Sequence, residues 1–378
     1  MKIGFDVSQT GQRKSGCGYF ADSLIQAIAQ LDQKNQYILY RTFGDFYWDP
    51  DYKKIQGVKR ANFTWGNQHG GLDEARFFWR QPLNHILKEL SEPNILHINN
   101  YFCPEKKIPE TKLVYTLYDL SFMDYPEWAT EQNRVLCCDN IFNASLWADH
   151  MIAISEYSKQ HFLEMFPHYS EKKITVIPLA SRYHYCPELE KPEDLSQLMT
   201  GQFFLSVGTI EPRKNHQLLL QAYACLKASH KKIFPLVLVG GMGWMMEDFD
   251  KLLVELNIKE DVILLGYASD QTLQWLYQNC FCFIYPSLFE GFGLPVLEAM
   301  SCKAPVITSN TSSIPEITGT EAALLIDPYN LESLVEAMKN CLENKIDVSE
   351  LAQKGLERSK NFTWEKSAEK VLDVYACL

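Results

Sequence analysis

The sequence predicts an α/β protein of two domains, and two observations support this. The chain has 378 residues, which is more than a single hydrophobic core usually holds. Each half also begins in the same way, with a short apolar strand, a glycine-bearing loop and a helix whose apolar residues recur at helical spacing. The first half starts with Lys2–Val7 and the loop Ser8–Gly18, and the second with Gln202–Val207 and the loop that begins at Gly208.

Residues 181–200 separate the two predicted domains. Proline and charged residues replace the apolar periodicity in this segment, which is typical of a linker. The N-terminal domain is therefore predicted over residues 1–180 and the C-terminal domain over residues 201–360. A last helical segment covers residues 361–378.

Further strands are expected where short apolar runs are followed by turn residues. In chain order they are Gln36–Thr42, Asn94–Ile98, Lys112–Leu117, Met151–Ile154, Lys173–Ile177, Phe234–Val239, Asp261–Leu265, Phe281–Tyr285, Ala304–Thr308 and Ala322–Ile326. Helices are expected over 131–148, from the cap Ser155 to Phe166, over Gln271–Gln278 with Asp270 as cap, and over Leu331–Leu342. Residues 43–82, rich in aromatic side chains and glycine, are expected to be irregular. They either cover the sheet or form a wall for an acceptor or a membrane surface.

Charge and cysteine content exclude several classes of protein. The formal net charge is −11, so no nucleic-acid partner is expected, because neutralising phosphates requires clustered cations. The 11 cysteines show neither metal-ligand spacing nor a disulfide framework, which favours a reducing compartment. A strand begins directly after Met1, and no apolar run approaches the length of a transmembrane helix. We therefore expect a cytoplasmic protein that needs no metal or cofactor.

The most informative stretch is the segment from Phe281 to Ile317. A buried strand is followed by the loop Glu290-Gly-Phe-Gly293 and by a helix with Pro295 at its start, where proline is tolerated. Such a helix start binds anions through its free N–H groups and the positive end of its dipole. Glu290 and Glu298 add two carboxylates. A nucleotide sugar offers phosphates to the amides and hydroxyls to the carboxylates.

This stretch resembles the Glu-x7-Glu motif of retaining GT-B glycosyltransferases of family 4, also called glycosyl transferases group 1. The similarity includes Glu290-Gly-Phe-Gly-Leu-Pro-Val-Leu-Glu298-Ala-Met, Pro305-Val-Ile and Ser313-Ile-Pro-Glu316. The alternative is a surface helix with two charges. The resemblance implies the GT-B fold, with two Rossmann-like domains facing across a cleft and residues 361–378 crossing back to the N-terminal domain. It also implies metal-independent transfer of a sugar with retention at the anomeric carbon.

By the same resemblance, donor-binding roles fall on the C-terminal domain. Lys214, with Arg213, would bind the diphosphate, and Thr209 stands where the family has an arginine. Glu298 would hold the ribose hydroxyls and Glu290 the sugar hydroxyls. The amides of Gly291, Phe292, Gly293 and Leu294 would contact sugar and phosphate, and the base would lie against Gly240, Gly266 and Tyr267.

The N-terminal domain carries a second set of matching residues. Gly16 and Gly18 lie in the loop that the family turns toward the donor diphosphate and the acceptor, although such glycines also occur in a simple turn. Tyr118 replaces a family histidine that contacts the donor sugar, and as a tyrosine it can still donate a hydrogen bond. Asp119 matches the family, with capping of the following turn as its alternative role.

The resemblance predicts a hexosyltransferase that acts on a glycan or lipid-linked acceptor in polysaccharide or lipopolysaccharide biosynthesis. The variant Gly208-Thr-Ile-Glu-Pro-Arg-Lys-Asn215 recurs in bacterial mannosyltransferases, which favours GDP-mannose as donor over a UDP-sugar. One alternative is a catalytically silent subunit that binds a nucleotide sugar within a glycosylation complex. Another is a GT-B phosphorylase or epimerase. Peripheral contact with the inner face of the membrane is compatible with each of these hypotheses.

Overall fold

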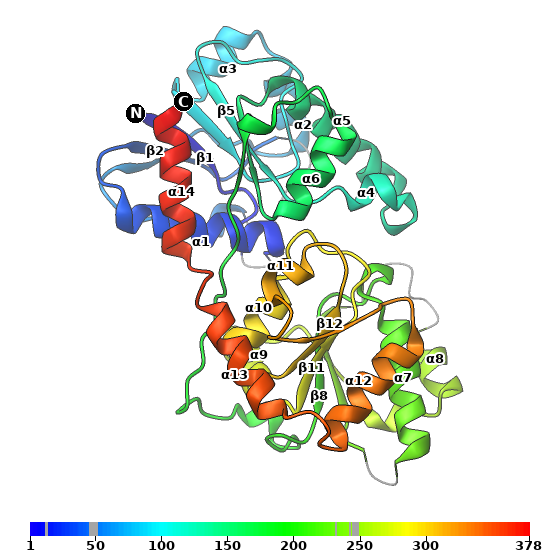
Figure 1. Cartoon of the computed structure of the whole chain (residues 1–378). Coiled ribbons are helices and arrows are strands. Elements are labelled where there is room, and N and C mark those ends of the chain that lie inside the picture. Colours follow the sequence, from blue (N-terminus) through cyan, green and yellow to red (C-terminus); the bar gives the residue numbers. More distant parts are fainter. Residues whose placement is uncertain (12–13, 45–51, 231–232, 242, 244–248) are drawn as a thin grey trace. The chain divides into compact units, whose positions relative to one another are not determined.

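The computed structural model describes residues 1–378 apart from 12–13, 45–51, 231–232, 242 and 244–248. The chain divides into two compact units (Figure 1). Unit 1 consists of Met1–Leu179 together with Phe362–Leu378, and unit 2 of Ala180–Asn361. The segment 181–200 thus belongs to unit 2, and the last helix returns to unit 1.

Unit 1 is built on a seven-stranded sheet in the order β3-β2-β1-β4-β5-β6-β7, and the paired strands are parallel. The strands are β1 (Lys2–Asp6), β2 (Gln36–Tyr40), β3 (Phe63–Trp65), β4 (Ile95–Ile98), β5 (Lys112–Leu117), β6 (His150–Ala153) and β7 (Ile174–Val176). The near-continuous apolar sequence of these strands reflects a sheet covered on both faces. The strand order reverses between β1 and β4, which are neighbours in space.

The α-helices of unit 1 are α1 (Gly16–Leu31), α2 (Leu72–Trp79), α3 (Leu83–Glu89), α4 (Ser121–Asp124), α5 (Glu131–Trp147), α6 (Glu156–Met165) and α14 (Trp364–Cys377). Ser155 caps α6, as predicted, by accepting a hydrogen bond from the Ser158 amide. The C-terminal helix α14 packs against α1 (Figure 1).

A buried polar chain fixes α14 to the sheet. The Tyr375 hydroxyl lies 2.5 Å from His97 Nδ1, and His97 Nε2 lies 2.9 Å from Thr116 Oγ1. The Thr116 hydroxyl donates its one proton to Asn99 Oδ1, so it accepts the hydrogen bond from His97 Nε2. The other ring nitrogen, Nδ1, then accepts the hydrogen bond from the Tyr375 hydroxyl. Burial lowers the pKa of His97 to about 3, which keeps the ring neutral.

Unit 2 is built on a six-stranded parallel sheet in the order β10-β9-β8-β11-β12-β13. The strands are β8 (Phe204–Val207), β9 (Leu236–Val239), β10 (Val262–Gly266), β11 (Cys282–Tyr285), β12 (Val306–Ser309) and β13 (Leu324–Ile326). The α-helices are α7 (His216–Ser229), α8 (Phe249–Glu255), α9 (Asp270–Asn279), α10 (Leu294–Ser301), α11 (Ile314–Thr318), α12 (Leu331–Leu342) and α13 (Val348–Ser359). Helices α7, α8 and α12 cover one face of the sheet, and α9, α10 and α13 the other (Figure 1).

Two predictions of local structure were wrong. The segment 43–82, expected to be irregular, contains β3 and α2 in its described part, while residues 45–51 lie outside the described residues. Some of its aromatic side chains pack in the core of unit 1, since Phe78 is buried there and Trp79 packs against it, whereas Phe77 is exposed. Asp270 does not cap α9. Ser269 does, through its side-chain oxygen and the Thr272 amide, and Asp270 is the first helical residue.

Among the residues that the structure describes, no helix combines the length and the apolar character that crossing a membrane requires.

The glycines at the start of α1 allow a test of local packing. A Cβ on Gly18 would lie 2.0 Å from the backbone oxygen of Gln9, whereas a Cβ on Gly16 would meet nothing within 4 Å. We expect Gly18→Ala to destabilise the protein by about 2 kcal/mol, because a backbone carbonyl cannot move aside cheaply. The matched variant Gly16→Ala should leave the thermal unfolding midpoint unchanged or slightly raised. Equal midpoints for the two variants would show that the Gln9 carbonyl does not restrict the side chain at position 18.

Candidate functional site

Two loops leave the sheet of unit 2 where its strand order reverses. β8 and β11 are hydrogen-bonded neighbours, but the chain continues from β8 toward β9 and from β11 toward β12, on opposite sides. Such diverging connections leave a crevice at the carboxyl ends of the strands, where open α/β sheets bind ligands. The loop after β8 contains a short 3-10 turn, Pro212–Lys214, which carries Arg213 and Lys214. The loop after β11 carries Glu290.

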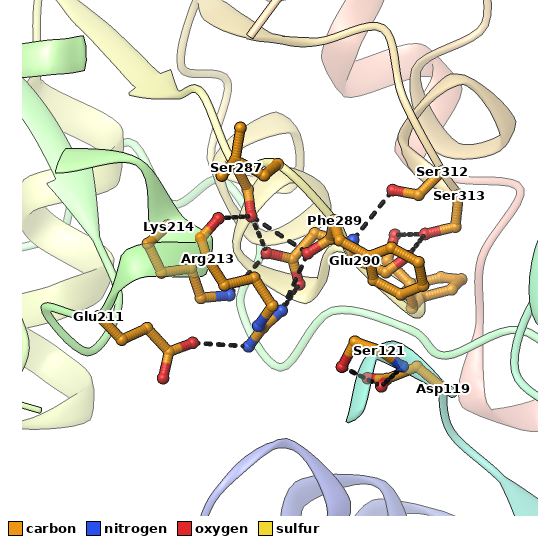
Figure 2. A network of polar contacts seen from close by, with 12 residues as sticks. Asp119, Ser121, Glu211, Arg213, Lys214, Ser287, Phe289, Glu290, Ser312 and Ser313 are labelled. Carbon is orange, nitrogen blue, oxygen red and sulfur yellow. Dashed lines mark hydrogen bonds and ion pairs between the residues drawn. The ribbon is translucent and has the colours of Figure 1, made fainter. Parts of the chain in front are cut away.

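Glu290 is the centre of the polar cluster that these loops form (Figure 2). Lys214 Nζ donates to its Oε1 at 2.6 Å, and Arg213 Nη1 donates to its Oε2 at 3.1 Å. The hydroxyls of Tyr285 and Ser287 lie 2.8 and 2.6 Å from the same Oε1. Tyr285 accepts from Lys214 Nζ at 2.5 Å, so its own proton is available to the carboxylate. The structure therefore brings together the three predicted residues Arg213, Lys214 and Glu290.

Burial and the two cations act in opposite directions on Glu290. Burial raises the pKa of its carboxyl, but Lys214 and Arg213 outweigh this effect and hold the pKa at about 2. Burial lowers the pKa of Lys214, and Arg213 adds to the decrease. The Glu211 carboxylate accepts from Arg213 Nη2 at 2.8 Å and supplies a second negative charge. The cluster of Glu211, Arg213, Lys214 and Glu290 thus has a formal charge of zero.

The backbone of the loop after β11 is fixed by the same neighbourhood. Arg213 Nη1 donates to the Phe289 carbonyl at 3.0 Å, and the Glu290 amide donates to Ser312 Oγ at 2.9 Å (Figure 2). Ser313 Oγ lies 2.8 Å from the Glu290 carbonyl oxygen. Position and orientation of the Glu290 carboxylate are therefore determined by the loop as well as by its ion pairs.

Gly293 determines where α10 begins. Its φ of 104° lies in the left-handed region, and a Cβ there would come 2.5 Å from Ile314 Cδ1, so only glycine fits. Leu294 is the first helical residue and Pro295 the second, where its missing N–H removes no intrahelical bond. The predicted sequence of strand, glycine loop and helix is confirmed. The first turn of such a helix can bind an anion through its backbone N–H groups.

Glu298 lies inside α10, as predicted, and has a different set of partners. The Arg182 guanidinium donates to its Oε1, and the Tyr277 hydroxyl donates to its Oε2 at 3.3 Å. Burial raises the pKa of the Glu298 carboxyl, and Arg182 opposes this increase. Sequence reasoning missed Arg182, because it lies in the segment 181–200, which offered only the composition of a linker.

The other predicted donor-side residues lie at the carboxyl ends of β8, β9 and β10. Gly208 and Gly240 have φ values of 150° and 145°, and a Cβ on Gly240 would lie 2.0 Å from the Gly208 oxygen. Glycine therefore lets these two loops approach each other closely. Thr209 is exposed, Gly266 has a φ of 64°, and the side chain of Tyr267 is 74% exposed.

Two predicted residues of unit 1 have structural roles at the end of β5. The Tyr118 hydroxyl donates to the Asn99 carbonyl at 2.9 Å, and its ring packs edge-on against Phe20. In this structure the hydroxyl therefore donates its one proton within the protein. Asp119 Oδ1 accepts from the amide and the hydroxyl of Ser121 at 3.0 and 2.7 Å, which is the turn-capping alternative.

The strand order of unit 1 also reverses at a polar cluster. Asp6, at the end of β1, accepts hydrogen bonds from the amides of Ser8 and Asn99 at 2.9 and 3.1 Å. Burial raises the pKa of Asp6 to about 6, with the Ser8 hydrogen bonds opposing this increase. Within the described residues, no cluster of three or more His, Cys, Asp and Glu side chains is arranged to hold a metal ion.

Several residues of the site were not predicted as functional: Arg182, Glu211, Tyr285 and Ser287. Tyr285 was predicted only as the end of an apolar strand. Ser287 was seen as a loop residue and Glu211 as part of the basic loop. The roles of Glu211, Tyr285 and Ser287 become visible only when the loops after β8 and β11 are placed side by side, and that of Arg182 only when its segment is placed beside α9 and α10.

Glu290 provides a pH-dependent test of this cluster. We expect Glu290→Gln to lower the free energy of unfolding by about 3 kcal/mol at pH 7, because one partner of a buried ion pair is lost. Its folded-state pKa lies below the unfolded value of 4.5. Ionised Glu290 therefore stabilises the wild-type protein fully above pH 4.5, and this contribution is lost as the pH falls toward 2. The difference in free energy of unfolding between wild type and Glu290→Gln should therefore become smaller as the pH falls.

Urea unfolding at pH 7 and pH 3.5 measures this difference. Glu211→Gln is the matched control, because it removes a buried carboxylate that contacts Arg213 and leaves the Lys214–Glu290 pair intact. Its effect should be smaller. A cost of Glu290→Gln that is the same at both pH values would show that the charge of Glu290 is not what stabilises the cluster.

Comparison with known proteins agrees with this geometry. A family model described as Glycosyl transferases group 1 matches residues 189–361. O-antigen chain mannosyltransferase B of Escherichia coli is 30% identical over 397 aligned residues, which cover 100% of both chains. Among solved structures, HepE of Anabaena in complex with UDP and glucose has a TM-score of 0.72 at 19% identity, with 100% of both chains covered. Sucrose-phosphate synthase from Thermosynechococcus elongatus has a TM-score of 0.74 at 19% identity, covering 100% of this chain and 98% of its own. The fold is the GT-B fold, and the chain belongs to the family of glycosyl transferases group 1.

Proposed function

We propose that this glycosyltransferase moves a hexose from a nucleotide diphosphate sugar to a hydroxyl of a glycan or lipid-linked acceptor, with retention at the anomeric carbon and without a metal. The observation that carries the proposal is the cluster of Lys214, Arg213 and Glu290 at the point where the strand order of unit 2 reverses. A leaving nucleoside diphosphate develops negative charge, and fixed cations beside it stabilise the transition state.

Mannose from GDP-mannose is the proposed donor sugar. The support is the full-length relative named as an O-antigen chain mannosyltransferase, together with the variant loop Gly208–Asn215. A UDP-sugar is the second candidate, because the structural relative HepE is described in complex with UDP and glucose. The proposed setting is polysaccharide or lipopolysaccharide biosynthesis in the cytoplasm, with peripheral contact at the inner face of the membrane.

The Lys214 ammonium group has a hydrogen-bond donor to offer a phosphate ligand. An ammonium group has three N–H donors, and Glu290 and Tyr285 receive two of them. We assign the third to the diphosphate, with Arg213 beside it. Because Glu290 already neutralises Lys214, the phosphates share this cation with the carboxylate. This arrangement favours an active enzyme over a catalytically silent binding subunit, since the charged groups that chemistry needs are in place.

The remaining roles are proposed from the family resemblance. Glu290 holds hydroxyls of the transferred sugar, and Glu298 holds the ribose. The amides of Gly291 to Leu294 contact sugar and phosphate, and the nucleotide base lies against the strand ends at Gly240, Gly266 and Tyr267, with Thr209 nearby. In unit 1, Gly16, Gly18 and Asp119 are assigned to the loops that meet donor and acceptor, and Tyr118 contributes its ring rather than its proton.

The first test is donor binding and turnover. Calorimetry with GDP, UDP, GDP-mannose and UDP-glucose should show binding of one nucleotide, and activity should persist in EDTA. Lys214→Ala should lower turnover by about 100-fold or more, because it removes a charged donor at the leaving group. The matched control is Lys227→Ala, which removes a lysine paired with Asp261 on the same unit and should leave turnover unchanged.

Thermal unfolding of Lys214→Ala must accompany this assay, because Lys214 is largely buried and paired with Glu290. Normal turnover in a folded Lys214→Ala variant would refute the phosphate assignment. Loss of activity in EDTA that magnesium restores would refute the metal-independent mechanism.

The second test separates the two glutamates. Ribose is present in donor and free nucleotide alike, so Glu298→Gln should weaken nucleoside diphosphate binding and raise the donor KM more than it lowers kcat. Glu290 acts beside the reacting sugar, so Glu290→Gln should lower kcat with a smaller change in nucleotide affinity. Both substitutions conserve size. The reverse pattern in calorimetry and steady-state kinetics would mean that the donor lies in the opposite orientation.

A further inference from the structure

Arg182 forms a buried ion pair with Glu298. It is the third residue of unit 2, in the segment that enters this unit from unit 1. Its Nε and Nη2 donate to Glu298 Oε1 at 2.8 and 2.7 Å. The two side chains are 15% and 3% exposed, so solvent screens this pair little. Two parallel N–H groups on one oxygen fix the carboxylate more firmly than a single bond would.

The guanidinium is itself held in place by two further residues. Its Nη1 donates to Asp270 Oδ1 at 3.1 Å, and the Tyr183 hydroxyl donates to the same oxygen at 2.8 Å. The Arg182 guanidinium also lies 4.7 Å from the centre of the Tyr183 ring, within cation–π range. Because Asp270 begins α9 and Glu298 lies in α10, Arg182 ties two helices to the entering segment.

These contacts use the two oxygens of Glu298 unequally. Oε1 receives two short hydrogen bonds from the charged Arg182 guanidinium, at 2.8 and 2.7 Å. Oε2 receives one long bond, from Tyr277 at 3.3 Å. Oε2 is therefore the oxygen that retains accepting capacity for a ligand hydroxyl, and Arg182 determines which way it faces.

We propose that Arg182 is a positioning residue of the donor site, which holds the Glu298 carboxylate by its Oε1 and turns its Oε2 toward the ribose hydroxyls of the bound nucleotide. The inference rests on the proposed function, because it takes Glu298 as the ribose ligand. Arg182 does not touch the ligand in this scheme. It acts through Glu298.

The groups that surround Glu298 make this role dependent on pH. Burial raises the pKa of its carboxyl, Arg182 and Tyr277 lower it, and Asp270 raises it. Tyr183 and Cys302 also interact with Glu298, and their own pKa values are raised well into the alkaline range. Arg182 is thus the one cation among these groups. Without it the Glu298 carboxyl should remain protonated to a higher pH.

The experiment is nucleotide binding by Arg182→Gln, measured by calorimetry from pH 6 to pH 8.5 with GDP and UDP as probes. At pH 6.5 the variant should bind about tenfold or more weakly than wild type, since a charged hydrogen-bond partner is lost. The deficit should narrow as the pH rises and Glu298 ionises. Arg182→Lys should recover part of the affinity and most of the normal pH profile. It restores the positive charge, but not the pair of N–H donors that the guanidinium directs at Glu298.

Two further variants show whether Arg182 acts through Glu298. In Arg182→Gln with Glu298→Gln, affinity should be no lower than in Glu298→Gln alone. Arg358→Gln is the matched control, because Arg358 is a part-buried arginine of unit 2 whose guanidinium donates to the carbonyls of Glu316 and Ile317. It should lower stability without changing the pH profile of binding. Arg182→Gln alone leaves the buried Glu298 charge unpaired and could fail to fold. The double variant removes both charges together, so it tests the inference in that case as well.

The outcomes separate this inference from the proposed function. If wild type binds neither nucleotide, both fail. If wild type binds and Arg182→Gln binds equally well, or shows the same deficit at every pH, only the role of Arg182 is overturned. An additive loss in the double variant would likewise overturn it, because Arg182 would then act independently of Glu298.

Discussion

The buried ion pair between Lys214 and Glu290 is the interaction on which the rest of the proposed donor site depends. It joins the loop after β8 to the loop after β11, and these are the two loops that diverge from neighbouring strands. Arg213 then fixes the backbone of the second loop through the Phe289 carbonyl. The same loop leads to Gly293, after which α10 begins.

The two units share a reversal of strand order in their sheets, but the polar residues at the reversal differ. The strand order reverses between β1 and β4 in unit 1 and between β8 and β11 in unit 2. Polar side chains lie at both points. Unit 1 places Asp6 and Asn99 at this point, where backbone amides satisfy a buried carboxyl whose pKa burial has raised. Unit 2 places a cluster with two cations there. The second arrangement suits the proposed function, because fixed cations stabilise the negative charge that develops on a leaving diphosphate.

The charges of the site are paired before any ligand binds. Glu290 balances Lys214, Glu211 contacts Arg213, and Glu298 is paired with Arg182. Pairing lowers the desolvation cost of holding these groups in a buried site, since an unpaired charge there would be expensive. It also keeps each side chain in one orientation, so that a ligand meets a preorganised set of donors and acceptors.

The sequence by itself determined the α/β class, most strands, and the order of strand, glycine loop and helix around Glu290 and Glu298. These features are local, since strand periodicity, the glycine at position 293 and the proline after it act within a few residues. Only the tertiary structure decided which side chains meet. Lys214 and Glu290 are 76 residues apart, and Arg182 and Glu298 are 116 apart. The first pair depends on which strands become neighbours, and the second on where the segment 181–200 packs. No short-range pattern in the sequence encodes either. For the same reason, the sequence did not reveal that the Tyr118 hydroxyl donates to the Asn99 carbonyl.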